Sequence, residues 1–242
     1  MKAKKATAEP KSKLKQESKS ASESKMKPTY LTALLMLGVS VLYAFVRYNI
    51  FKGVPLANFP LYVMNKSVAL AAVGLIALSF LMRAMSLAWP KVFGPKLYLR
   101  KWFGLFGFGF AAIHAMMSLL LFNASNYPKF FVNGQLSLVG ELSMLFGILA
   151  FFVFSIVALT SLPAIAKAMK PQDWQNVQRT GYIAFFLVLL HVFVMGFEGW
   201  LTPDKWPGGL LPISLIAFII IVFVLLVRLG LMLFAGKKPG AN

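Results

Sequence analysis

The sequence contains no cysteine and only two histidines. The lack of cysteine excludes disulfide bonds, thiol redox chemistry and thiolate-bound metal or iron–sulfur centres, because each of these requires the sulfur atom. Acidic residues are also scarce, with seven Asp and Glu against 25 Lys and Arg, and only 13% of all residues are charged. Soluble domains carry about 25% charged residues, so this composition, 59% hydrophobic, indicates an integral membrane protein whose main partner is the lipid bilayer.

The basic excess follows a membrane topology, so we expect no nucleic-acid partner. Nine of the 25 Lys and Arg residues lie in the first 27 positions, and most of the others lie near the ends of apolar runs. Residues 1–28 are rich in Lys, Ser and Ala and contain no apolar run, which predicts a disordered basic cytoplasmic tail. Residues 237–242 are expected to form a short basic C-terminal tail.

Six apolar runs within residues 29–236 are each about 20 residues long, the length of a membrane-spanning helix. They cover residues 30–50, 66–88, 102–123, 142–163, 180–200 and 209–235. If both termini are cytoplasmic, 20 of the 25 Lys and Arg residues lie on the cytoplasmic side, as the positive-inside rule favours. The sequence therefore predicts an all-α, multi-pass bundle of six transmembrane helices with both termini in the cytoplasm.

His114 and His191 are the candidate ligands of a cofactor, because ionisable side chains inside a membrane usually mark a functional site. His114 follows Arg100 by 14 residues, and His191 follows Arg179 by 12. At ~1.5 Å per residue, the two rings are expected roughly 21 and 18 Å from these interfacial anchors, on spans that run in the same direction. Two axial imidazoles suit haem iron, whereas zinc or copper would need further Cys, His or carboxylate ligands.

Small residues near both histidines would leave room for a porphyrin. Gly107 and Ala111 lie seven and three positions before His114, and Ala184 lies seven positions before His191, so each shares a helix face with its histidine. We therefore expect these three residues to line the cofactor, and each imidazole N–H to donate to a carbonyl or hydroxyl of a neighbouring helix. The alternative is that the small residues only permit close helix packing and that the histidines only crosslink helices.

Three segments resemble the ferric reductase-like transmembrane domain family. They are RKWFGLFGFGFAAIHA (100–115), LSLVGELSMLF (136–146) and LTSLPAIAKAMKPQDWQNVQRTGYIAFFLVLLH (159–191). Within that family the pattern is most similar to the haem-binding membrane subunit of the bacterial periplasmic methionine sulfoxide reductase system. The resemblance implies that His114 and His191 are axial ligands of a b-type haem in the outer half of the membrane. Gln178 stands where the family has a further histidine, so we expect one haem per chain at most.

The resemblance also implies electron transfer across a bacterial inner membrane, by a subunit of an oxidoreductase system and not by a self-contained enzyme. The expected donor is a membrane quinol or, second, a flavin or flavoprotein, so FMN or a quinone would be the further cofactor. The expected acceptor is a partner reductase at the periplasmic face. Two alternatives stay open, a stand-alone ferric reductase and a non-redox assembly or scaffold subunit that has lost the cofactor.

Overall fold

The computed structural model describes residues 11–235, with side chains for residues 28–233. Among these residues, six helical segments are long and apolar enough to cross a membrane, which confirms the expected all-α architecture of a multi-pass membrane protein. They are Pro28–Phe51, Leu56–Ala88, Leu99–Leu121, Leu138–Thr160, Pro171–Trp200 and Pro207–Leu233. Each expected span lies largely within one of these segments.

The spans consist of long α-helices joined by short elements. In chain order, the helices that form the spans are α1 (Lys11–Phe45) with its π-helical extension η1 (Val46–Phe51), α2 (Met64–Ala88), α4 (Leu99–Leu121), α5 (Leu138–Thr160), α7 (Pro171–Trp200) and α8 (Ile213–Ala235). The shorter elements are η2 (Leu56–Asn58), π-helical η3 (Phe59–Val63), α3 (Pro90–Phe93), η4 (Gly94–Lys96), η5 (Pro128–Phe130), β1 (Phe131–Val132), β2 (Gln135–Leu136), α6 (Pro163–Ala168), η6 (Pro203–Lys205) and η7 (Pro207–Gly209).

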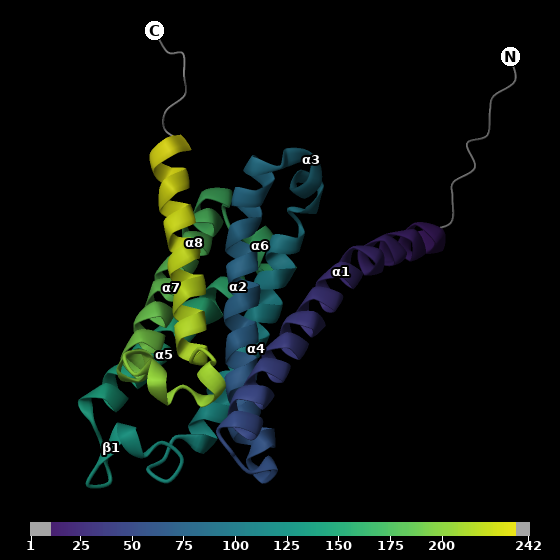
Figure 1. Ribbon diagram of the computed structural model, residues 1–242. Helices are drawn as coiled ribbons and strands as arrows, with labels where there is room; N and C mark the ends of the chain where they lie inside the picture. Colours follow the sequence, from purple (N-terminus) through teal and green to yellow (C-terminus); the bar gives the residue numbers. More distant parts are fainter. Residues whose placement is uncertain (1–10, 236–242) are drawn as a thin grey trace, which may run out of the picture.

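The two ends of the bundle are easily told apart. α3 and the end of α8 lie at one end, which we call the α3 end, and β1 lies at the other, which we call the hairpin end (Figure 1). The strands β1 and β2 pair antiparallel around Asn133 and Gly134, both of which have positive φ angles of 52° and 79°. Asn-Gly favours this conformation, which a two-residue hairpin turn requires.

The N-terminal part of α1 differs from the expectation of a disordered tail over residues 1–28. The backbone is helical from Lys11 onward, and this part of α1 leans away from the bundle (Figure 1). The segment 11–27 contains six Lys and two Glu, which are good helix formers, beside five Ser, and it continues directly into a membrane span. Residues 1–10 and the expected C-terminal tail, 237–242, lie outside the described residues.

α2 is the central helix of the bundle. In its most apolar stretch 61% of the residues are buried, against 11–28% in the other five spans. α2 packs most extensively along α4, and α5 along α7, whereas α4 and α7 make almost no close backbone approach within the described chain. The helices α4 and α7, which carry the two histidines, therefore belong to different packed pairs.

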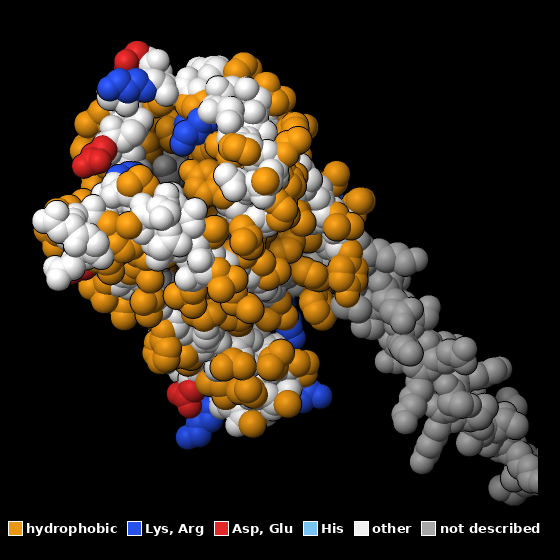
Figure 2. Space-filling view, turned by 90° about the horizontal axis from the view of Figure 1, so that it is seen from below, with side chains coloured by type: hydrophobic (Ala, Val, Ile, Leu, Met, Phe, Trp, Pro, Cys, Tyr) orange, Lys and Arg blue, Asp and Glu red, His pale blue; other side chains and the backbone are white. Residues whose placement is uncertain are grey.

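The outer surface of the bundle suits a lipid environment. Large hydrophobic side chains point outward from most helices, such as Leu120 on α4 and Phe152 on α5, which are 73% and 64% exposed. Viewed from the hairpin end, hydrophobic and uncharged polar side chains cover most of the surface, with few charged groups (Figure 2). Such contiguous apolar surface is stable against acyl chains and not against water.

Candidate functional site

His114 lies on α4, seven residues before the helix ends at the hairpin end. Its Nδ1 is 2.7 Å from Oδ1 of Asn65, a buried residue on α2. The amide Nδ2 of Asn65 in turn donates to Oγ of Ser118 over 3.1 Å. Because an amide oxygen can only accept, Nδ1 of His114 is the donor, and Nε2 is left unprotonated with a free lone pair.

His191 lies on α7, nine residues before that helix ends at the same end of the bundle. Its Nδ1 donates to the backbone oxygen of Ser143 on α5 over 2.8 Å, and Oγ of Ser143 is 3.3 Å away. The ring lies against the α5 backbone, since a Cβ at Gly147 would be 3.1 Å from Nδ1 and 3.3 Å from Cε1 of His191. Glycine at this position therefore makes room for the imidazole.

The two imidazoles share one arrangement. In each, Nδ1 is fixed by an oxygen acceptor on a neighbouring helix, as we expected, although the acceptor at His114 is an amide oxygen. Within the part of the chain that the structure describes, Nε2 of neither ring has a hydrogen-bond partner. A hydrogen bond at one ring nitrogen and a free lone pair at the other is the usual state of a histidine that binds a metal.

The described side chains alone do not provide a full coordination sphere for a metal ion. Among the described residues, no group of three or more His, Cys, Asp or Glu side chains is placed to hold a metal ion. Two imidazoles are enough for iron only if a prosthetic group supplies the other ligands, as a porphyrin does. The donor set therefore fits a haem better than a bare metal ion.

Two of the small residues expected to line a cofactor have another evident role. A Cβ at Gly107 would lie 2.7 Å from Cγ1 and 3.0 Å from the backbone nitrogen of Ile76, so Gly107 permits the close contact of α4 with α2. Ala184 is fully buried in the core cluster that includes Phe185, and Ala111 is half-buried. Contact of Gly107, Ala111 or Ala184 with a cofactor stays a prediction.

Gln178 connects α7 to the last turn of α5. Its Nε2 lies 3.1 Å from the backbone oxygen of Val157, 3.1 Å from Oγ1 of Thr160 and 3.2 Å from Oγ of Ser161. Trp174, one turn earlier, donates its indole N–H to the backbone oxygen of Thr160 over 3.0 Å. Gln178 therefore forms a polar crosslink between α7 and the end of α5.

A lysine lies next to the His114 side of the site. Lys66 follows Asn65 in the chain, and its ammonium is 3.5, 5.1 and 5.4 Å from the ring centroids of Tyr62, Tyr127 and Tyr48. It also donates to the hydroxyl of Tyr127 over 3.3 Å. Three tyrosine rings thus surround the Lys66 amino group close to the residue that orients His114.

A second lysine lies close to the His191 side. Lys129, in the segment between α4 and α5, donates to the backbone oxygen of Met195, one turn beyond His191 on α7, over 2.6 Å. Burial lowers the pKa of the Lys129 ammonium, and the nearby carboxylate of Glu198 partly opposes this shift. Both sides of the site are therefore flanked by basic groups toward the hairpin end.

Sequence reasoning missed the residues that hold the two rings. Asn65 lies one residue before the expected second span, and the structure begins α2 at Met64 directly after the π-helical η3. Ser143 and Gly147 are four residues apart on α5, so they share a face. A search for polar and glycine residues with this spacing inside apolar runs would have found that pair, but not its contact with His191.

A family model described as "Ferric reductase like transmembrane component" matches residues 67–189, just over half of the chain. The match includes His114 and ends two residues before His191.

Curated relatives are similar to the chain over part of their length. "Metalloreductase STEAP2" of Mus musculus is 25% identical over 203 residues, which cover 73% of this chain and 42% of that protein. The Homo sapiens protein of the same name is 26% identical over 168 residues, which cover 58% of this chain and 34% of that protein. "Metalloreductase STEAP3" of Rattus norvegicus is 27% identical over 166 residues, which cover 57% and 34%. The chain thus spans about two fifths or less of the length of these relatives.

Proposed function

Because the chain belongs to the ferric reductase-like transmembrane family, we propose that it transfers electrons through the membrane by means of one b-type haem bound between His114 and His191. One observation carries the proposal. Both rings are fixed at Nδ1 by an oxygen on a neighbouring helix, and both Nε2 atoms are free of protein partners among the described residues. A histidine that only crosslinks helices gains nothing from an unused ring nitrogen in an apolar interior.

Each residue of the site has a definite task in this proposal. His114 and His191 bind the iron through Nε2, while Asn65 and the Ser143 backbone oxygen hold the rings in orientation. When bound, the haem supplies one-electron oxidation and reduction between ferric and ferrous iron. The apolar helices around the rings exclude water and so tune the reduction potential.

The number of haems follows from the two histidines and from Gln178. A second b-type haem with two imidazole ligands needs two further histidines, and the sequence has none. Gln178, which the resemblance places at the position of a further histidine, lies near three acceptor atoms at the C-terminal end of α5. We therefore infer one haem per chain.

The donor approaches the site from the α3 end in our proposal. With no second haem to bridge the distance, a membrane quinol is the first candidate donor and a flavin or flavoprotein the second. Arg100, Lys101 and Arg179 lie near the ends of α4 and α7 on that side and suit the phosphate of a flavin.

The acceptor receives electrons at the hairpin end, where Lys66 and Lys129 flank the site. Two acceptors are favoured by different observations. The printed name of the relatives, metalloreductase, favours a metal ion as the substrate. The motif similarity to the membrane subunit of the methionine sulfoxide reductase system favours a periplasmic partner reductase and a bacterial inner membrane.

Substitution of the histidines tests the proposal. The protein is purified in mild detergent from haem-replete cells, and its dithionite-reduced minus oxidised absorbance spectrum is recorded for the wild type and for His114→Ala and His191→Ala. We expect a b-type spectrum in the wild type and its loss in each variant. Met116→Ala is the matched control, because this side chain lies two residues beyond His114 on α4 and is 68% exposed. A spectrum that survives both histidine substitutions would rule out the assignment.

A further inference from the structure

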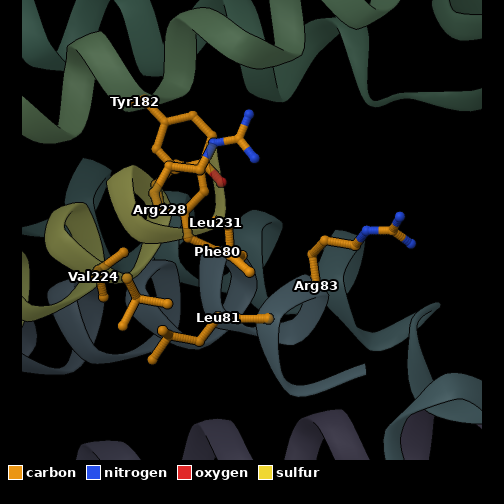
Figure 3. A pocket seen from close by; sticks show the side chains of 9 residues that line it. Phe80, Leu81, Arg83, Tyr182, Val224, Arg228 and Leu231 are labelled. Atoms are coloured by element: carbon orange, nitrogen blue, oxygen red, sulfur yellow. The ribbon is translucent and has the colours of Figure 1, made fainter. Parts of the chain in front are cut away.

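A narrow cleft lies between α2, α7 and α8 toward the α3 end, away from the histidine site (Figure 3). Its walls are mostly apolar, and its polar groups are the side chains of Arg83, Tyr182 and Arg228. The cleft encloses about 10 Å³, which is about the space of one water-sized group. A flavin or quinone ring does not fit inside it, so the cleft is not the donor site of the proposed function.

Two arginines from different helices share this cleft. Arg83 lies five residues before the end of α2, and Arg228 lies seven residues before the end of α8. In Figure 3 the guanidinium group of Arg228 lies beside the Tyr182 ring, and that of Arg83 extends outward from α2, apart from it. At ~1.5 Å per residue, these positions are roughly 8 and 10 Å from the helix ends, a depth at which a long arginine reaches the lipid headgroups.

Neither guanidinium group has an acceptor among the residues whose side chains the structure describes. Among residues 28–233, no hydrogen bond and no ion pair involves the side-chain nitrogens of Arg83 or Arg228. Arg228 instead lies over the ring of Tyr182, with its Cζ 5.1 Å from the ring centroid. Tyr182 is itself stacked on Phe80, with centroids 4.3 Å apart. The aromatic pair thus holds one guanidinium in place while its N–H groups stay available.

We propose that Arg83 and Arg228 bind the phosphate of an anionic phospholipid at the mouth of this cleft. A guanidinium group binds phosphate through two parallel hydrogen bonds, and two long, flexible arginine side chains lining one cleft provide the positive charge for one anionic headgroup. No Asp or Glu lines the cleft to oppose it. The cleft itself is too small for an acyl chain, so the lipid's acyl chains would lie against the exposed apolar side chains on the outer surface of α8, such as Leu229 and Met232.

The test measures lipid-specific stabilisation of the full-length protein in detergent. The unfolding temperature is recorded with added phosphatidylglycerol, with phosphatidylcholine and with inorganic phosphate. We expect phosphatidylglycerol to raise the unfolding temperature of the wild type by roughly 5 °C at saturating lipid, and phosphatidylcholine and free phosphate to raise it far less. The double variant Arg83→Gln/Arg228→Gln should lose the extra rise, and native mass spectrometry should show one bound phosphatidylglycerol fewer.

Two further variants keep the test decisive. Lys91→Gln removes an exposed positive charge from α3, at the same end of the bundle but outside the cleft, and should keep the full response to phosphatidylglycerol. Arg83→Lys/Arg228→Lys keeps the charge if the glutamine variant does not fold, and should weaken the response because lysine lacks the bidentate geometry.

The proposal is overturned if the glutamine variant responds like the wild type, if phosphatidylcholine stabilises equally, or if inorganic phosphate alone gives the whole effect. Haem content is measured on the same samples and should be unchanged in every arginine variant. The lipid site and the proposed function can therefore fail independently.

Discussion

The two histidines are held in different ways. His191 donates to a backbone oxygen of α5 and lies over Gly147, whereas His114 donates to the side chain of Asn65 on α2. The backbone carbonyl of residue 143 is present whatever its side chain, so no substitution there removes the acceptor of His191. The orientation of His191 depends instead on the space left by Gly147. The orientation of His114 depends on one replaceable amide. The same chemical requirement is therefore met by backbone packing on one side of the site and by a side chain on the other.

Among the residues that contact the two histidines, Gly147→Val should reduce the haem content of the purified protein most. Even a Cβ at residue 147 would lie 3.1 Å from Nδ1 of His191, and valine adds two further methyl groups. The ring must move away from α5 and lose its bond to the Ser143 carbonyl, so we expect most of the haem to be lost from the purified protein. Gly109→Val on α4, where nothing lies within 4 Å of a Cβ, is the matched control and should keep its haem.

Asn65→Leu should weaken haem binding to a smaller extent. Leucine has a similar volume and no acceptor, so His114 keeps its place but loses the oxygen that fixes Nδ1. We expect haem affinity to fall by about 10–100-fold, measured by haem titration of the apoprotein. Asn65→Asp also presents an oxygen to Nδ1 and should retain haem. If leucine and aspartate behave alike, the hydrogen bond has no role in the site.

Gln178→Leu should affect stability and leave the haem unchanged. The variant removes the amide that donates to the α5 backbone oxygen of Val157, and one such bond contributes about 1 kcal/mol. For a chain of this length that corresponds to a fall of about 2–4 °C in unfolding temperature. A change in haem stoichiometry would show instead that Gln178 takes part in cofactor binding.

Ser143→Ala should have the smallest effect of the four. The main acceptor for His191 is the Ser143 backbone oxygen at 2.8 Å, and Oγ at 3.3 Å is the weaker partner. Alanine preserves the backbone acceptor, so the haem spectrum should stay as in the wild type. A loss of haem comparable to that in Asn65→Leu would mean that both histidines depend on side chains, and the contrast between them would be wrong.

The sequence predicted the helices but not the contacts between them. Apolar runs of membrane-spanning length gave all six spans, and the positions of His114 and His191 within two of these spans followed directly. Gly107 shows why contacts are harder to predict. Helical periodicity places it on the face of His114, but only the packing of α4 on α2 shows that this face meets Ile76.

Asn65 and Gly147 were missed for related physical reasons. The orientation of Asn65 depends on the π-helical segment η3, whose extra residue per turn changes the register at the start of α2. The role of Gly147 depends on the packing of α7 against α5, which no local pattern encodes. The hydrogen bonds at Nδ1 were expected from the chemistry of ligation, yet the residues that accept them required the structure.

The most direct test of the central claim is the electron paramagnetic resonance spectrum of the oxidised, purified protein, combined with the molar ratio of haem to chain. Two imidazole ligands on one iron predict a low-spin ferric signal and a ratio of one haem per chain. A high-spin signal would show that at least one histidine does not bind the iron, and a ratio near two would show a second site that Gln178 does not exclude. A protein purified without haem from haem-replete cells would contradict the account.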